Sequence, residues 1–221
     1  MKVCTDSCLF GAWIASVIEN KNINPKTILD IGTGTGLLSL MLAQKSDAGI
    51  DAVEIDRNAY EQAMQNVSIS AWHDRIKIFN ADIKKWHPSL KYDLIISNPP
   101  FYENNLFPED ERKTISKHGA ALSLEELITI AKNLLNNDGS VAVVLPWQRT
   151  NFFENLALKH FLFVKEKIEV KQTTSHDYFR TMFILQKQKT AIRKNAITIK
   201  NTDNKYSNEF KDLLKDYYLY L

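Results

Sequence analysis

Short runs rich in Ile, Leu and Val alternate with segments of helical periodicity along the first two thirds of the chain. Several of these runs are apolar on both faces, as strands are when helices cover each side of a parallel sheet. The alternation therefore predicts an α/β fold with a mostly parallel sheet. The predicted strands are residues 27–31, 50–54, 76–79, 92–97 and 140–145, and the predicted helices are residues 37–44, 58–70 and 123–136.

The last third of the chain predicts a different arrangement. Residues 161–170 and 181–186 have the pattern of strands, and the segment between them is too short for a long helix. An antiparallel hairpin on the edge of the sheet fits this spacing. Residues 197–199 predict another short strand, and residues 208–219 a final helix. Because no repeat, low-complexity tract or linker interrupts the sequence, we predict one domain over residues 1–221.

Simple counts exclude several classes of protein. The longest unbroken apolar run, Leu9–Ile18, has ten residues and is too short to span a bilayer. Asp6 precedes this run and no cleavage pattern follows it, which argues against a signal peptide. Two cysteines, Cys4 and Cys8, cannot form a disulfide framework, and no His and Cys spacing is typical of a zinc site. We therefore expect a cytoplasmic protein without a metal and without a membrane partner.

Charge is unevenly distributed along the sequence. The whole chain has 28 Lys and Arg against 26 Asp and Glu, a net charge of +2. Residues 159–200 alone contain ten basic and three acidic residues, a local balance of +7 on an otherwise slightly acidic chain. Such a region is typical either of a face that meets a polyanion or of ordinary solvated strands and loops, and charge alone leaves both readings open.

A glycine-rich turn follows the first predicted strand and opens the first predicted helix. Its sequence is Asp30-Ile-Gly-Thr-Gly-Thr-Gly36, and glycine permits positive φ angles and the close approach of a ligand to the backbone. The dinucleotide-binding pattern G-x-G-x-x-G does not fit, because its last glycine would fall on Leu37 or Ser39. Asp30 also argues against that ligand, since a carboxylate repels a pyrophosphate but suits the ammonium of an amino acid.

Acidic residues follow the next two predicted strands. Glu54 ends the second strand, where a carboxylate can accept both hydroxyls of a ribose. Asp56 is better placed to cap the following helix. Asp82 comes after the third strand and suits an adenine amino group, with Ala81 or Ile83 donating a backbone N–H to the ring. Three acids at the ends of three successive strands, behind a glycine-rich turn, predict a nucleoside site.

These features resemble the class I S-adenosylmethionine (AdoMet) methyltransferases. The resemblance implies a Rossmann-like, seven-stranded, mostly parallel sheet with helices on both faces and an antiparallel last strand. It also implies AdoMet as the cofactor, with the glycines at its methionine part, Glu54 at its ribose and Asp82 at its adenine. The predicted cofactor-binding residues are Thr5, Asp30, Gly32, Gly34, Gly36, Glu54, Asp82 and Asn98.

A second motif, Asn98-Pro-Pro-Phe-Tyr102, follows the fourth predicted strand. Its two prolines withhold their N–H donors and leave a stiff loop with exposed carbonyls. The Asn98 side chain and the Pro99 carbonyl are acceptors for the hydrogens of an exocyclic amine, and an aromatic ring can stack on the base. The motif predicts that Asn98, Pro99, Pro100 and Phe101 are catalytic and aim the amine at a methyl group. Phe101 and Tyr102 are predicted to contact the substrate.

This motif resembles the N-P-P-[FY] signature of methyltransferases that act on amino groups conjugated to a π-system. The opening M-K-V-C-T-D-S-C-L-F-G-A-W and the ending Y-S-N-E-F-K-D-L-L-K-D-Y-Y-L are similar to those of the bacterial tRNA(Val) adenine-37 N6-methyltransferases. Cys4 departs from that family, which usually has Gly there. The resemblance implies N6-methylation of a tRNA adenine, with tRNA as the partner. The sequence leaves the oligomeric state open, and a monomer is favoured.

A tRNA substrate would give the basic region a role. The residues predicted to contact tRNA there are Lys165, Lys167, Lys171 and Arg180. Three alternatives remain: a glutamine-N5 protein methyltransferase, a guanine-N2 rRNA methyltransferase, and a non-catalytic module that binds AdoMet or RNA. The basic region and the two end motifs disfavour the first, the absence of room for a duplicated domain disfavours the second, and an intact N-P-P-F motif disfavours the third.

Overall fold

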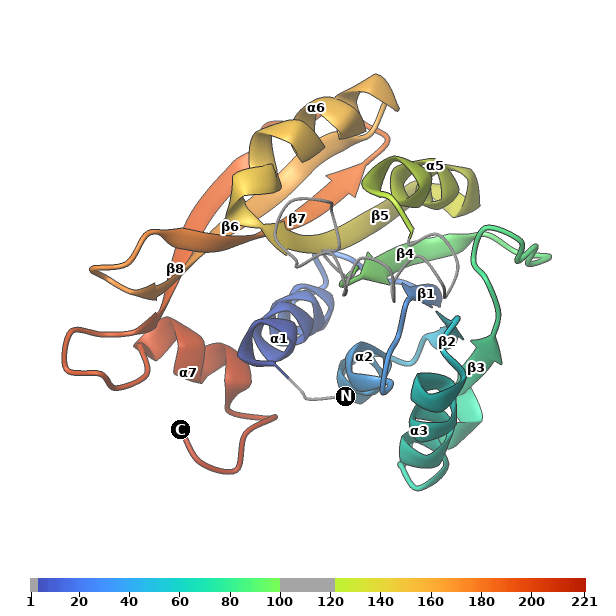
Figure 1. Cartoon of the computed structure of the whole chain (residues 1–221), viewed down its shortest axis with the longest axis horizontal. Coiled ribbons are helices and arrows are strands. Elements are labelled where there is room, and N and C mark those ends of the chain that lie inside the picture. Colours follow the sequence, from blue (N-terminus) through green and yellow to red (C-terminus); the bar gives the residue numbers. More distant parts are fainter. Residues whose placement is uncertain (1–3, 100–121) are drawn as a thin grey trace, which may run out of the picture.

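The computed structural model describes residues 4–99 and 122–221. Its centre is one eight-stranded sheet with the strand order β3-β2-β1-β4-β5-β7-β6-β8 (Figure 1). The first five strands of the chain pair in parallel, whereas β7 runs antiparallel to both β5 and β6. The strands are β1 (Thr27–Ile31), β2 (Gly49–Glu54), β3 (Ile76–Asn80), β4 (Tyr92–Ser97), β5 (Leu135–Pro146), β6 (Phe163–Thr173), β7 (Tyr178–Gln186) and β8 (Arg193–Lys200).

Helices cover both faces of the sheet and divide the core into two layers. α5 and α6 pack on one face, and α1, α2 and α7 pack on the other (Figure 1). The helices are α1 (Thr5–Glu19), α2 (Leu37–Lys45), α3 (Arg57–Ser68), α5 (Leu124–Leu134), α6 (Thr150–Lys159) and α7 (Asn208–Leu214), with 3-10 turns at His73–Arg75 and Trp147–Arg149.

The architecture confirms the predicted α/β fold, with its mostly parallel sheet, its helical layers and its antiparallel seventh strand. The strand count differs by one, because β8 is a full strand that pairs with β6 in parallel. The predicted antiparallel hairpin is confirmed as β6 and β7, which follow β5 in the sheet. It lies next to the edge and not at it, because β8 pairs with the outer side of β6. β7 lies between β5 and β6, and its run from Thr181 to Gln186 is buried.

Several element boundaries differ from the prediction. α5 ends at Leu134, because the chain becomes extended at Leu135, where β5 begins beside Tyr92. Gly139 therefore lies inside β5, where an added Cβ would come within 2.8 Å of the Leu135 side chain. α7 is shorter than predicted and ends at Leu214. The Leu214 carbonyl accepts hydrogen bonds from the N–H groups of Tyr217 and Tyr218 in the turn that follows.

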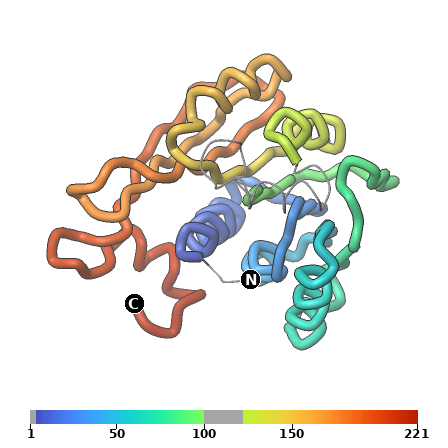
Figure 2. Tube along the Cα trace, viewed as in Figure 1, coloured from blue at the N-terminus to red at the C-terminus, as the bar shows by residue number. Residues whose placement is uncertain are grey.

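The N-terminal helix α1 and helix α6 were not among the predicted helices. α1 is apolar around most of its circumference, and its residues from Cys8 to Ile18 are buried apart from Ser16. A helix of this kind belongs in a core. α1 lies between α2 and α7, so the chain's first helix contacts its last one (Figure 2).

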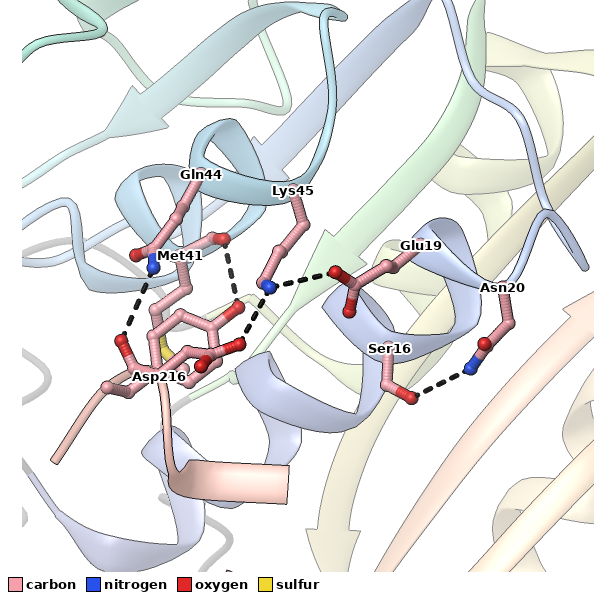
Figure 3. A network of polar contacts seen from close by, with 8 residues as sticks. Ser16, Glu19, Asn20, Met41, Gln44, Lys45 and Asp216 are labelled. Atoms are coloured by element: carbon pink, nitrogen blue, oxygen red, sulfur yellow. Dashed lines mark hydrogen bonds and ion pairs between the residues drawn. The ribbon is translucent and has the colours of Figure 1, made fainter. Parts of the chain in front are cut away.

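Lys45 attaches the segment after α7 to the helices α1 and α2 (Figure 3). Its ammonium donates to Glu19 Oε1 at 2.9 Å and to Asp216 Oδ2 at 2.7 Å. The neighbouring Tyr217 hydroxyl donates to the Met41 carbonyl at 3.3 Å. The two ends of the described chain are thereby held on the same face of the sheet.

Within residues 4–99 and 122–221, no helix combines the length and the apolarity needed to cross a membrane. The same residues bring together no group of three His, Cys, Asp or Glu side chains that would hold a metal ion. No disulfide joins Cys4 and Cys8 in the described part of the chain.

Candidate active site

The glycine-rich turn has a backbone that only glycine adopts readily. Gly32, Gly34 and Gly36 all have positive φ angles, of 71°, 60° and 84°. The Gly32 N–H donates to the Val53 carbonyl at 2.8 Å, which ties the turn to the end of β2. A Cβ built on Gly32 would meet no atom within 4 Å, and the residue is exposed. The turn therefore presents open backbone at the carboxyl edge of the sheet.

Asp30 lies beneath this turn and is wholly buried. Its Oδ2 accepts hydrogen bonds from the Thr33 hydroxyl at 2.6 Å and the Ser39 hydroxyl at 2.7 Å. Its Oδ1 has no hydrogen-bond partner among the described residues. Burial raises the pKa of the Asp30 carboxyl to about 6. Because Asp30 is sealed from solvent, it would act on a ligand through the turn or through a bridging water.

Glu54 links the end of β2 to the same turn. Its Oε2 accepts the Gly34 N–H at 2.8 Å, and its Oε1 accepts the Asp56 N–H at 2.9 Å. A carboxylate has about four acceptor positions, so each Glu54 oxygen can accept a further hydrogen bond. Asp56 caps α3, with its Oδ1 accepting the Ala59 N–H at 2.8 Å, as predicted.

The residues after β3 lie along the same edge. Asp82 is half-buried, and its Oδ1 accepts the Lys84 N–H at 3.0 Å. The Ala81 N–H donates to the Glu54 carbonyl at 3.1 Å, so it does not serve as the predicted donor to a ring. Ile83 remains as the candidate donor, since its N–H has no acceptor within the described part of the chain.

Ile55 was missed by the sequence analysis. This apolar side chain stands between Glu54 and Asp56, and 57% of the residue is exposed. It is therefore an apolar surface beside the predicted nucleoside site, where a flat ring can pack. The signal in the sequence was its position directly after the strand-terminal acid.

Asn98 begins the second motif directly beside the glycine-rich turn. Ile31 and Ser97 are partners in the β1–β4 pair, and the Ser97 hydroxyl donates to the Ile31 carbonyl at 2.8 Å. Gly32 and Asn98 therefore leave two adjacent strands, which are about 4.8 Å apart. Asn98 is half-buried and Pro99 is buried. Pro100, Phe101 and Tyr102, the other predicted residues of this motif, lie outside the described residues.

A hydrogen bond from the N-terminal helix orients the Asn98 amide. Asn98 Nδ2 donates to Ser7 Oγ at 2.8 Å, which leaves the amide oxygen without a partner among the residues described. Ser7 had no role in the sequence analysis. A contact between residues 91 positions apart has no signal in local sequence.

The first turn of α1 also contacts β7. The Arg180 Nε donates to Asp6 Oδ2 at 2.7 Å, and both side chains are mostly buried. Thr5, a predicted cofactor-binding residue, is exposed at the start of α1. This turn therefore joins the second motif to the C-terminal third of the chain.

Ion pairs divide the predicted tRNA contacts into two groups. Lys167 pairs with Glu154 at 2.7 Å, and Arg180 pairs with Asp6. Lys165 and Lys171 have no ion pair within the described ranges, and Lys171 Nζ lies 4.6 Å from the centre of the Tyr178 ring. The charged groups of Lys165 and Lys171 are therefore more available to an anionic partner than those of Lys167 and Arg180.

Known protein sequences are similar to this chain over most or all of its length. The model of the methyltransferase small domain family matches residues 12–173. A tRNA1(Val) (adenine(37)-N6)-methyltransferase of Trichodesmium erythraeum is 42% identical over 99% of this chain and 91% of the relative. The relative of the same name from Christiangramia forsetii is 40% identical over 100% of this chain and 92% of its own length.

Solved structures share the fold. A protein of Agrobacterium tumefaciens described as a predicted O-methyltransferase superposes with a TM-score of 0.71 over 95% of each chain, at 15% identity. A methyltransferase from Pyrococcus furiosus superposes with a TM-score of 0.58 over 82% of this chain and 83% of that chain, at 23% identity. These likenesses establish the class I methyltransferase fold. The full-length similarity in sequence goes further, and it places this chain in the methyltransferase small domain family, among the sequences that include the tRNA1(Val) (adenine(37)-N6)-methyltransferases.

Proposed function

We propose that the protein transfers a methyl group from AdoMet to the N6 amine of an adenine in tRNA, at position 37 of the anticodon loop of tRNA(Val). The observation that carries this proposal is the position of Asn98, one strand from Gly32, with its amide held by Ser7. An acceptor for an exocyclic amine then stands beside the backbone predicted to hold a methyl donor. The names of the full-length relatives support the tRNA substrate.

The residues at the edge of β1 and β2 fit AdoMet. The open backbone at Gly32 admits a ligand, and the unpartnered Asp30 Oδ1 suits a water-bridged ammonium. Glu54 has acceptor positions left for the ribose hydroxyls, and the exposed Ile55 offers an apolar face to the adenine ring. Asp82 and the Ile83 N–H supply an acceptor and a donor to the edge of that ring.

The chemistry required of the protein is positioning. When bound, AdoMet supplies a methyl group on a sulfonium, which is already a good leaving group. The Asn98 oxygen and the Pro99 carbonyl would accept the two amine hydrogens and direct the nitrogen lone pair along the line of transfer. Holding two reacting groups in such a geometry contributes up to about 7–11 kcal/mol to lowering a barrier. The amine releases one proton to solvent after the N–C bond forms, so no strong base is needed.

A target adenine must leave its stack to reach this edge of the sheet. Extrusion costs less from a loop than from a duplex, which fits a position in an anticodon loop. Phe101 and Tyr102 remain our candidates for stacking on the extruded base, on the strength of the sequence motif.

The test is a methyl-transfer assay with unmodified tRNA(Val) transcript, followed by nuclease digestion and mass mapping. We expect N6-methyladenosine at position 37 and no product in a transcript with guanine there. A release factor and rRNA fragments, offered under the same conditions, should stay unmodified. Methylation of a glutamine or of a guanine N2 in those substrates, with none in tRNA, would overturn the proposal.

A further inference from the structure

We propose that Trp147 and Tyr178 form a stacking platform for a nucleotide next to the target adenine, in a single-stranded RNA loop. The inference deepens the proposed function and rests on it, because the occupant is a base of the same RNA substrate. Neither residue belongs to a motif that the sequence analysis singled out.

The two rings are held in place and remain open to solvent. Trp147 is 38% exposed, and its ring stacks on that of Tyr178 with 6.0 Å between centroids and 30° between planes. The indole N–H of Trp147 donates to Glu169 Oε1 at 3.2 Å, and this hydrogen bond fixes the orientation of the ring. Lys171 Nζ lies 4.6 Å from the centre of the Tyr178 ring. A fixed aromatic surface with an adjacent cation suits a base and its phosphate.

The strand register places this platform close to the methyl-acceptor site. Val143 of β5 is the partner of Ser97 of β4, so Val144 is level with Asn98, and Trp147 follows three residues later, directly after the end of β5. Three residues of strand and one strand spacing give a separation on the order of 10 Å between the two backbones. The nucleotides on either side of an extruded adenine can cover such a span.

The N-terminal helix fixes the two places relative to each other. Ser7 holds the Asn98 amide, and Asp6 holds Arg180. Arg180 is the partner of Pro146, the residue before Trp147, in the β5–β7 pair. The platform and the acceptor site are therefore parts of one contiguous set of contacts.

Aromatic platforms select single strands. The faces of bases in a duplex are covered by their neighbours, whereas loop bases can leave the stack and pack on an aromatic ring. Each such contact changes RNA affinity about 5- to 150-fold. A protein partner would also be able to use an exposed tryptophan, and the experiment below separates the two.

The experiment measures binding of a fluorescently labelled anticodon stem-loop by the parent protein and by three variants. Trp147→Leu should weaken binding at least about 5-fold, whereas Trp147→Phe should stay close to the parent because it retains a ring. The matched control is Phe161→Leu. Phe161 is 68% exposed and has Lys132 Nζ 5.1 Å from its ring, but it precedes β6 at the opposite edge of the sheet. AdoMet affinity and thermal midpoint should be unchanged in Trp147→Leu.

A second stem-loop, with an abasic site beside the target adenine, identifies the occupant. The abasic site is placed in turn at each nucleotide next to the target adenine. Where the removed base is the one that stacks, the parent should bind the abasic loop about tenfold more weakly than the intact loop. Trp147→Leu should not distinguish intact from abasic loops.

Equal binding of the intact loop by the parent and Trp147→Leu, or an abasic penalty of the same size in both, would overturn the platform. If the parent methylates the loop and Trp147→Leu binds and methylates it equally well, the platform is refuted but the proposed function is not. A parent that binds AdoMet but neither binds nor methylates the loop refutes the proposed function as well.

Discussion

At the scale of single residues, the orientation of one amide decides whether the acceptor site works. An Asn side chain has a donor end and an acceptor end of nearly the same shape. The Ser7 hydroxyl accepts from Asn98 Nδ2, so the oxygen is the end that remains for an amine. Under the proposed function Ser7 is a positioning residue, and Asn98 is the residue predicted to make the catalytic contact.

This assignment predicts a graded loss of turnover. Asn98→Ala should lower kcat roughly 100-fold or more, as the removal of a group that acts in the transition state does. Ser7→Ala should lower kcat about fivefold, since a neutral hydrogen bond contributes about 1 kcal/mol, and Ser7→Thr should restore it. AdoMet affinity, measured by calorimetry, should stay within a few fold in all three. Ser16→Ala, in the same helix, is the control.

An opposite result is easy to recognise. If Asn98→Ala greatly weakens AdoMet binding while kcat at saturating AdoMet is normal, Asn98 is a cofactor-pocket residue. If Ser7→Thr remains as slow as Ser7→Ala, the hydroxyl does not orient the amide.

Asp30 predicts a specific dependence of stability on pH. Its pKa is about 6 in the folded protein because of burial, against an ordinary value of 3.8 in the unfolded chain. Between these two pKa values the Asp30 carboxyl is protonated in the folded protein and ionised in the unfolded chain. The contribution of Asp30 to the free energy of unfolding therefore falls as the pH rises from about 4 to about 6. Asp30→Asn retains acceptors for Thr33 and Ser39 but does not titrate. Its stability relative to the parent should rise over that range, by up to roughly 3 kcal/mol, and then level off.

Urea unfolding of both proteins from pH 4 to pH 8 measures this difference. A constant offset across the range would mean that Asp30 titrates alike in the folded and unfolded states. The single variant isolates Asp30 from the other carboxyl groups, which titrate in both proteins.

Sequence reasoning reached the site where local patterns carry the information. A positive φ angle favours glycine, and a helix N-cap favours a short acid such as Asp56, which accepts the N–H three residues later. The glycine-rich turn and the role of Asp56 were therefore both predictable. Ser7 and Trp147 were not, because their roles depend on residues brought together by the sheet and by α1. The cofactor and tRNA roles given to the predicted site residues stay predictions.

At the scale of elements, the strands of the sheet were predicted better than the helices that flank it. Buried parallel strands give continuous apolar runs, which short windows detect. α1 has an apolar circumference and no polar face, so its periodicity is too weak to separate it from a strand or a signal sequence. β5 begins five residues before its apolar run, because backbone pairing continues through polar residues.

The attachment of the C-terminal segment predicts two very different costs of mutation. Phe210 is fully buried in α7, with its ring stacked 4.7 Å from that of Tyr206. Phe210→Ala should destabilise the fold by about 3–5 kcal/mol. Lys45→Met removes both ion pairs of Figure 3, but Glu19 and Asp216 are 56% and 41% exposed, so the loss should stay within about 1 kcal/mol.

Chemical unfolding of the two variants gives these values. The matched control is Phe152→Ala, which removes a ring that is 49% exposed and should cost under about 0.5 kcal/mol. A loss in Lys45→Met as large as that in Phe210→Ala would show that the ion pairs, rather than the apolar contacts of α7, hold the segment.

At the scale of the whole molecule, the basic region predicts a salt-dependent affinity for RNA. Lys165, Lys171 and Lys194 have no ion pair in the part of the chain that is described, whereas Lys167, Arg180 and Arg193 each have one. The triple variant with Gln at the first three should bind tRNA more weakly and with a flatter dependence on salt, because each phosphate contact releases counterions. AdoMet binding should be unaffected.

A triple variant of equal charge provides the control. Lys26→Gln, Lys77→Gln and Lys91→Gln neutralise exposed lysines that lie before β1, on β3 and before β4, away from the carboxyl edge. Filter binding at a series of salt concentrations compares the two variants with the parent. Equal slopes for all three proteins would show that the basic region of residues 159–200 is only solvated surface.

The ion pair between Asp6 and Arg180 joins positions 174 residues apart, and this has a consequence for the order of synthesis. A ribosome releases α1 first, yet the strand and the helix that hold it, β7 and α7, come last. Until β7 has been made, β5 lacks its antiparallel neighbour and Asp6 lacks its partner. A nascent chain that already contains the glycine-rich turn and Asn98 therefore has both motifs without the clamp that aligns them. Methyl transfer should therefore begin only after β7 and α7 have been made and have joined the fold.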